Sequence, residues 1–373
     1  MAKNFLRALI EAARSGREAR RNNGVIDDLP ARGITFDGAL DDIDIAGVAE
    51  VGRGAIGDIA VDPDRETVVV TNVGTQSLTV INPHTMGVVG SVRLPGDPFH
   101  VVVADDRAYV SVTGAAHDSI LTVDTITGAV LSEYPLAMTV TALAISPDGK
   151  RVFAGRAGHE RIDIAVIDTT AERVGTIDLA TGAGVNLDAL QVDSTGKRLL
   201  AATSDPRGSR LVVVNTETAQ VQATVWIGAP IRDVAIGDGI AYVLTSDLAH
   251  RGVVHTVDLS AATVVDAVEV AAAPTQLVLS ADATRAYLVD YDRVIVWCAL
   301  TGQVQGSVDV DVEPTSVALR HDGTRLYVAD YAGRVNIFEV AESLYSQLVA
   351  TDAVEIAAMP AMPAMPALAP AGA

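Results

Sequence analysis

The sequence predicts an all-β protein, a seven-bladed β-propeller, and three observations lead to this fold class. A unit of about 43 residues recurs seven times, its short segments alternate with period two and are rich in Val, Ile and Thr, and no amphipathic helices separate them. Four short strands in a unit of this length are typical of a propeller blade. A parallel α/β fold would instead need helices between its strands.

The second strand of each unit provides the first repeat marker. Its central residue is aromatic or aliphatic in every unit, and successive copies are 40 to 47 residues apart. These residues are Val69, Tyr109, Phe153, Leu200, Tyr242, Tyr287 and Tyr327.

A second marker follows the third strand and keeps the same spacing. In five units it is Asn or Asp, usually followed by Thr, which is typical of a turn residue whose side chain accepts hydrogen bonds from its own backbone. The marker residues are Asn82, Asp124, Asp168, Asn215, Asp258, Cys298 and Glu339. Two markers that recur together seven times predict seven blades.

The last unit lacks its fourth strand. It supplies strands at about 314–320, 325–330 and 334–340, whereas residues 46–51, just before the first unit, resemble the closing strands of the other units. We therefore expect the N-terminal strand to complete the last blade, which closes the ring and leaves no blade short of a strand.

Four segments of the repeats carry a recurring motif: VVVTN (68–72), SPDGKRVF (146–153), IDT (167–169) and YVAD (327–330). They resemble the YVTN-type repeats of bacterial seven-bladed propellers, and the resemblance covers about residues 43–340. The chain departs from the pattern in blades 1, 3 and 4, which lack the proline of the turn before the first strand, and at Trp297-Cys298, where an Asp is typical. This resemblance implies the fold and leaves the function open.

Two segments lie outside the expected propeller of residues 43–340. Residues 1–24 are expected to form a basic amphipathic helix followed by a linker over 25–42. Residues 341–373 form a C-terminal extension, whose Ala/Met/Pro repeat after about 350 is expected to be disordered.

The composition excludes several classes of protein. With 49% hydrophobic residues the chain has enough apolar surface for a large core, and 47 acidic against 27 basic residues give a net charge of −20, which disfavours nucleic-acid binding. No stretch is long and apolar enough to span a membrane, and no secretory signal is recognised, so we expect a monomeric, cytoplasmic propeller.

The candidate ligand site is one mouth of the central channel, where the first strand of each unit begins. Aligning the units places one residue per blade at a comparable position: Asp58, His100, Ala142, Ala189, Asp233, Gln276 and Ser316, with Arg232 beside Asp233. Carboxylates, an imidazole and a guanidinium around one opening can bind a small polar ligand or a cation. The alternative is a polar channel that holds only water.

Neither a catalytic group nor a metal or cofactor site is assigned from the sequence. The seven histidines show no metal-ligand spacing. The segment Gly52–Gly57 matches G-x-G-x-x-G, but a strand pattern follows it where a nucleotide-binding site needs a helix.

The residues therefore favour a non-catalytic binding or scaffolding propeller, which presents its loops and channel mouth to a partner protein or a small polar ligand. The first alternative is a lactonase, because some bacterial sugar-lactone hydrolases are similar propellers. It would use His100, Arg232 and Asp233 for proton transfer and oxyanion stabilisation.

The second alternative is a propeller associated with the inner face of the membrane. Basic residues of the expected N-terminal helix fall close to one line along its surface: Lys3, Arg7, Arg14, Arg17 and Arg21. Such a stripe can bind an anionic lipid surface or a partner, or it can dock on the acidic propeller.

Overall fold

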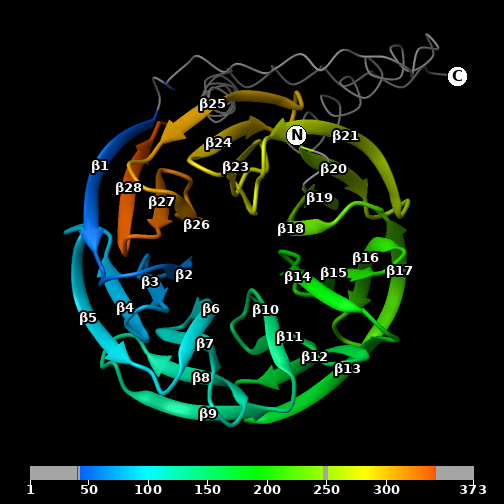
Figure 1. The fold of residues 1–373 in the computed structure, drawn as a ribbon, viewed down its shortest axis with the longest axis horizontal. Coiled ribbons are helices and arrows are strands. Elements are labelled where there is room, and N and C mark those ends of the chain that lie inside the picture. Colours follow the sequence, from blue (N-terminus) through cyan, green and yellow to red (C-terminus); the bar gives the residue numbers. More distant parts are fainter. Residues whose placement is uncertain (1–39, 41–42, 247–250, 342–373) are drawn as a thin grey trace, which may run out of the picture.

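The computed structural model describes residues 40, 43–246 and 251–341 and shows seven four-stranded antiparallel sheets arranged in a ring (Figure 1). These are the blades of a seven-bladed β-propeller, as the sequence predicts. The described residues contain no helix, and therefore none that could span a membrane. The expected N-terminal helix, the linker and most of the C-terminal extension lie outside the described residues.

Each blade runs from an innermost strand at the channel to an outermost strand at the rim. Blade 1 is β2 (Ile56–Val61), β3 (Val68–Asn72), β4 (Ser77–Asn82) and β5 (Gly87–Arg93). Blade 2 is β6 (Asp97–Ala104), β7 (Arg107–Thr113), β8 (Asp118–Asp124) and β9 (Val130–Leu136). Blade 3 is β10 (Thr139–Ile145), β11 (Arg151–Ala157), β12 (Arg161–Asp168) and β13 (Arg173–Thr181).

The remaining blades repeat this order. Blade 4 is β14 (Asn186–Val192), β15 (Arg198–Asp205), β16 (Gly208–Asn215) and β17 (Gln220–Trp226). Blade 5 is β18 (Ile231–Gly237), β19 (Ile240–Thr245), β20 (Gly252–Asp258) and β21 (Thr263–Ala271). Blade 6 is β22 (Gln276–Leu279), β23 (Arg285–Val289), β24 (Arg293–Cys298) and β25 (Gln303–Asp309). Blade 7 is β26 (Pro314–Leu319), β27 (Arg325–Asp330), β28 (Arg334–Val340) and β1 (Ile43–Glu50).

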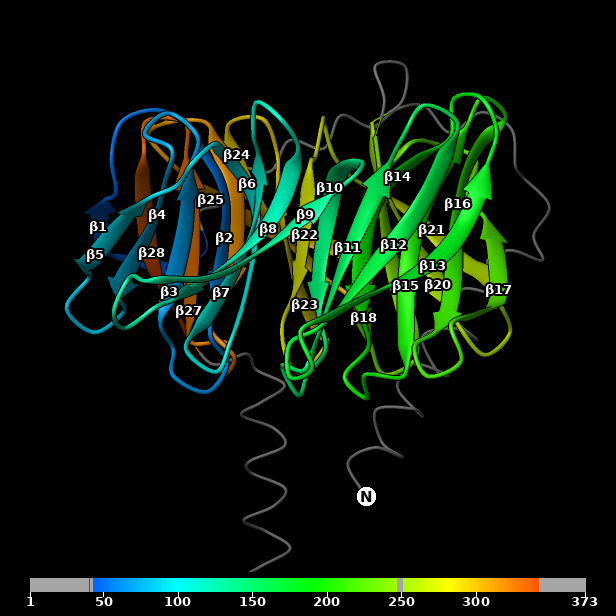
Figure 2. The same cartoon turned by 90° about the horizontal axis from the view of Figure 1, so that it is seen from below.

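The hydrophobic core lies between the blades. Second strands such as β3, β7 and β11 are buried on both faces, because each sheet packs against the sheets on either side of it (Figure 2). The buried residues accordingly form seven clusters, and most clusters combine residues of two neighbouring blades; Phe153 of blade 3, for example, belongs to the same cluster as Leu199 of blade 4.

The turn after the third strand is held by the predicted side-chain hydrogen bonds in five blades. The marker side chain accepts the backbone N–H groups two and three residues later; Asp124, for example, accepts from Ile126 at 3.0 Å and from Thr127 at 2.7 Å. Asn82, Asp168, Asn215 and Asp258 make the same pair of bonds. The prediction for this turn is confirmed in these blades.

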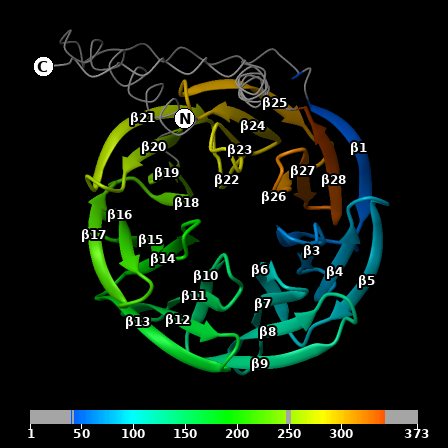
Figure 3. The ribbon, with the colours of Figure 1, turned by 180° about the vertical axis from the view of Figure 1, so that it is seen from behind.

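The N-terminal strand completes blade 7. β1 is antiparallel to β28, with Gly47 opposite Ile337 and Ala49 opposite Val335, and Figure 3 shows β1 at the rim between β28 and β5. The strand begins three residues earlier than the predicted segment 46–51 and ends one residue before it. The last blade is thus built from both ends of the propeller sequence.

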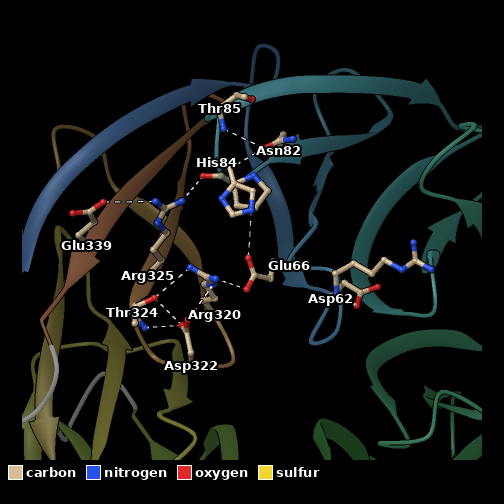
Figure 4. Close-up of polar contacts among 12 residues, drawn as sticks. Asp62, Glu66, Asn82, His84, Thr85, Arg320, Asp322, Thr324, Arg325 and Glu339 are labelled. Carbon is tan, nitrogen blue, oxygen red and sulfur yellow. Dashed lines mark hydrogen bonds and ion pairs between the residues drawn. The ribbon is translucent and has the colours of Figure 1, made fainter. Parts of the chain in front are cut away.

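Side chains reinforce the junction of blades 7 and 1 (Figure 4). The Arg320 guanidinium forms an ion pair with the Glu66 carboxylate, and His84 Nε2 lies 3.6 Å from the other Glu66 oxygen. Arg325 donates a hydrogen bond to the Pro83 carbonyl oxygen. The contacts of Arg320 and Arg325 cross from blade 7 to blade 1 and add to the pairing of β1 with β28, whereas that of His84 with Glu66 lies within blade 1.

The segment Gly52–Gly57, which matches the nucleotide-binding pattern, lies close to backbone atoms of other parts of the propeller. A Cβ on Gly57 would lie 2.9 Å from the Phe99 carbonyl oxygen, and Gly54, at φ +92°, has the backbone of Gly74 beside it. Residue 56 already begins strand β2, as the sequence predicts. Gly57 therefore permits close backbone approach between blades 1 and 2, and Gly54 permits close approach to the turn at Gly74.

Candidate functional site

Every innermost strand presents its candidate residue at the same structural position. In five blades an irregularity near the start of that strand interrupts the pairing with the second strand, and the candidate residue follows it; Asp58, for example, pairs with Thr71, and Asp233 with Leu244. In blade 2 the irregularity runs from Pro98 to Val101, and His100 lies within it. The aligned residues belong to strands β2, β6, β10, β14, β18, β22 and β26, which lie next to one another around the channel.

The six polar or charged candidates line one cavity. This cavity has a volume of about 620 Å³, and its wall includes Asp58, His100, Arg232, Asp233, Gln276 and Ser316. Four more polar residues, each one position before an aligned residue, also line it: Thr141, Asp188, Thr275 and Thr315. The structure thus brings all predicted propeller site residues together at the channel.

Asp58 and Asp233 both use their carboxylates to join neighbouring blades. Asp58 Oδ1 accepts the Ile59 backbone N–H at 2.9 Å, and its Oδ2 accepts that of Val101 in blade 2 at 3.1 Å. Asp233 repeats this between blades 5 and 6, with Val234 at 2.8 Å and Leu277 at 2.9 Å. These carboxylates thus have a structural role.

Gln276 makes the corresponding contact between blades 6 and 7. Its Oε1 accepts the backbone N–H of Val317 at 2.7 Å. An amide oxygen can replace a carboxylate here because the partner is a neutral N–H donor. Three of the seven blades are therefore joined to the next blade by the same kind of side-chain bond.

Burial raises the pKa of both carboxyl groups. It raises the pKa of Asp58 to about 7 against the opposing effect of the N–H donors Val101 and Ile59, and the negative charge of Asp233 adds to the rise. Burial likewise raises the pKa of Asp233 to about 6, against the N–H donors Leu277 and Val234. The channel thus holds two carboxyl groups that titrate near neutral pH.

His100 and Arg232 are held by their surroundings. Burial lowers the pKa of His100, and a hydrogen bond to the Thr141 backbone opposes this shift. Because burial has the larger effect, the ring is neutral at neutral pH. Arg232 Nε donates to the Ser246 carbonyl oxygen at 3.1 Å and lies 3.2 Å from the Ser246 hydroxyl oxygen.

Three buried oxygen atoms on the cavity wall have no hydrogen-bond partner among the described residues. They are Asp188 Oδ2, Thr315 Oγ1 and Ser316 Oγ. Burial raises the pKa of Asp188, while a hydrogen bond with Ser204 and the positive charge of Arg232 oppose the rise. Buried polar atoms are normally satisfied by protein, water or a ligand, so these three lack a partner that a bound water or a ligand would supply.

Asp188 and Thr315 were not predicted as site residues. Each lies within the strand irregularity, one position before the aligned residues Ala189 and Ser316. An aligned repeat identifies one residue per blade, whereas the irregularity turns a second side chain towards the channel. The sequence feature that could have identified both residues is a polar side chain just before the aligned position.

No group of three potential metal ligands occurs in the part of the chain that the structure describes. The predicted basic stripe of the N-terminal segment, from Lys3 to Arg21, lies outside that part. The channel mouth is therefore the candidate site that the structure places.

Comparison with known proteins gives close relatives of this chain. A seven-bladed beta-propeller protein of Mycolicibacterium smegmatis is 66% identical over 356 residues, which cover 94% of this chain and 95% of the relative. The seven-bladed beta-propeller protein Rv1057 of Mycobacterium tuberculosis is 32% identical over 291 residues, covering 68% of this chain and 74% of the relative. The chain belongs to this family of seven-bladed beta-propeller proteins.

Two further findings concern the fold of this seven-bladed propeller protein. A chain of Kuenenia stuttgartiensis hydrazine synthase has a TM-score of 0.70 and 19% identity, with 79% of this chain and 98% of that chain covered. At this identity the likeness shows the fold alone. No family model matches the sequence, so the resemblance to YVTN-type repeats stays a resemblance.

Proposed function

We propose that this protein is a non-catalytic binding propeller that holds a small polar ligand in its channel mouth. The observation that supports the proposal is the set of unpartnered oxygens at Asp188, Thr315 and Ser316 around a cavity of about 620 Å³. A ligand that satisfies these atoms would recover hydrogen bonds that the described residues do not supply.

Nothing in the geometry favours the lactonase alternative. A general base needs an accessible acceptor, whereas both Asp233 oxygens accept backbone N–H groups. Arg232 Nε is directed at Ser246, and the ring of His100 is bonded to the Thr141 backbone. No described contact joins these three side chains to one another.

The membrane alternative depends on residues 1–24, outside the described part of the chain. It remains a prediction, tested by flotation of the full chain with anionic vesicles against a chain that begins at residue 25. Equal flotation of the two proteins would remove it.

Binding at the channel mouth is tested with a panel of monosaccharides, polyols, amino acids and small amines, by thermal shift and then by titration calorimetry. We expect at least one compound to bind the wild type, and Thr315→Val or Ser316→Ala to weaken that binding about tenfold, the effect of one buried hydrogen bond. Ser132→Ala, on the outer strand of blade 2, is the matched control. Failure of every compound, or binding that ignores both channel variants, would overturn the proposal.

A further inference from the structure

A ring of aliphatic residues surrounds the channel beyond the polar mouth. It lies three residues after the aligned site position, and every blade supplies one Val, Ile or Leu. The ring consists of Val61, Val103, Ile145, Val192, Ile236, Leu279 and Leu319. At about 3.3 Å per strand residue, it is roughly 10 Å further along the channel than Asp58 and Asp233. We call it the aliphatic ring.

The aliphatic ring faces open space. Val192, Ile236 and Leu279 line the same 620 Å³ cavity as the polar mouth. Val61, Val103, Ile145 and Leu319 line a second cavity of about 290 Å³, and His321 lies on the wall of both cavities. Five of the seven ring residues are only partly buried, so apolar surface is left towards the channel.

The residues between the polar mouth and the aliphatic ring are also mostly apolar. Two residues after the aligned position the blades supply Ala60, Val102, Ala144, Gln191, Ala235, Val278 and Ala318. Gln191 is the one polar member of this set. The channel therefore has an apolar band beyond the polar mouth. Polar residues that follow the aliphatic ring in the sequence line the same cavities again: Ser146, Ser194, Ser280 and His321.

The polar end favours a head group that donates hydrogen bonds. Its unpartnered atoms include a carboxylate oxygen of Asp188. Two more carboxyl groups, those of Asp58 and Asp233, add acidic character to the same wall, although their oxygens already accept backbone N–H groups. Against these stands the single guanidinium of Arg232. Carboxylate oxygens accept hydrogen bonds, so ammonium or hydroxyl groups match this mouth better than an anion does.

We propose that the ligand of the channel is a single-chain amphiphile whose ammonium or hydroxyl head binds at the polar mouth and whose aliphatic chain passes through the aliphatic ring. The proposal rests on the function proposed above and adds the chemical class of the ligand. The chain moves from water into contact with aliphatic side chains, which is the favourable step.

The aliphatic ring also packs between blades, and this role alone would favour aliphatic residues there. Ile145 and Leu319, for example, pack against two of the buried clusters between blades. A purely structural ring and a ligand-binding ring differ in one measurable property, the dependence of affinity on the length of an alkyl chain.

The test is a calorimetric titration of the full chain with n-alkylamines from ethylamine to decylamine, each below its micelle concentration. We expect affinity to rise about two- to fourfold per added CH₂ until the chain is longer than the channel. Equal affinity for ethylamine and decylamine would overturn the amphiphile proposal and leave the polar-mouth proposal intact. If no amine binds, this proposal is also overturned. The proposal of a polar ligand in the channel mouth is then decided by the panel of polar compounds described above.

Variants of blade 3 locate the effect. Ile145→Thr places a hydroxyl in the aliphatic ring and is expected to weaken decylamine binding at least fivefold while ethylamine binding stays unchanged. Val174→Thr, on the outer strand of the same blade, is the matched control and should leave both unchanged. Equal decylamine affinity of folded Ile145→Thr and the wild type would contradict the proposal, and the wild-type chain-length series decides alone if the variant does not fold.

Discussion

The Asp233 carboxylate accepts the backbone N–H of Leu277 at 2.9 Å, across the boundary between blades 5 and 6. The equivalent bond from Val101 to Asp58 joins blades 1 and 2, and that from Val317 to Gln276 joins blades 6 and 7. The bonded residues are 44, 43 and 41 positions apart, about one repeat unit. At these three boundaries the side-chain bonds therefore hold neighbouring innermost strands in register with each other.

Replacing Asp233 by Asn should destabilise the protein. Asn has one side-chain acceptor oxygen, so one of the buried N–H groups of Val234 and Leu277 loses its partner, at a cost of about 1–3 kcal/mol. The measurement is the free energy of unfolding from urea denaturation. Glu217→Gln, an equally conservative change on an exposed turn, is the control and should change stability by less than about 0.5 kcal/mol. Equal stability of the two variants would contradict the structural role of Asp233.

The raised pKa values of Asp58 and Asp233 predict that stability falls as pH rises from about 4 to about 7. Both carboxyl groups have a usual pKa of 3.8, which rises to about 7 and about 6 in the folded protein. Over this pH window the folded state holds more protons than the unfolded state, so raising the pH favours unfolding. The total effect is on the order of a few kcal/mol, because one unit of pKa corresponds to about 1.4 kcal/mol.

Urea denaturation at pH 5 and pH 7.5 measures this effect, and Asp58→Asn identifies its source. The variant should show a smaller difference between the two pH values than the wild type. Exposed turn carboxylates do not interfere in this window, because hydrogen bonds from the backbone lower the pKa of groups such as Asp124 and Asp168, whose contribution is lost below pH 4. The same pH difference in variant and wild type would show that Asp58 is not its source.

The sequence predicts the ring well because the signals of a blade are local. The alternation around Tyr109 and the turn at Asp124 each depend on residues a few positions apart, and seven repeats make them unambiguous. The role of Asp58 could not be predicted, because its partner Val101 lies 43 residues away and offers only a backbone N–H. Asp188 was missed because the alignment selects Ala189, whereas Asp188 lies within the irregularity between Leu187 and Ala189. The sequence marks this irregularity only by a polar residue just before the aligned position.

Closure of the ring is tested by two neighbouring residues of β1. Ala49 is 3% exposed and lies in the cluster with Val335 and Ile337, whereas Val48 is 44% exposed on the opposite face of the same strand. Ala49→Glu should cost more than about 3 kcal/mol, because it buries a charge without a partner. Val48→Glu should change stability by less than about 1 kcal/mol. Equal tolerance of the two substitutions in urea denaturation would show that β1 does not pack in blade 7.

Blade 3 contains a buried ion pair. Removing one partner should lower the stability strongly, whereas removing both partners should lower it only slightly. Arg156 Nε lies 2.7 Å from Asp163 Oδ1, and these side chains are 11% and 1% exposed; Arg161 lies 2.8 Å from the other Asp163 oxygen. Asp163→Ala leaves the Arg156 charge buried without its partner, for an expected loss of about 3–5 kcal/mol.

The double variant Arg156→Met/Asp163→Leu removes both charges and should recover most of that loss, because well-packed apolar residues can replace a buried pair. Asp178→Ala is the control: its carboxylate is 81% exposed, although it too pairs with Arg161, and exposed pairs contribute about 0–1 kcal/mol. Urea denaturation of the wild type, Arg156→Met, Asp163→Leu and the double variant gives the coupling between Arg156 and Asp163 as a double-mutant cycle. If Asp163→Ala costs no more than Asp178→Ala, the pair is not a source of stability in blade 3, and the packing of Phe153 and its neighbours between blades 3 and 4 holds this part of the ring without it.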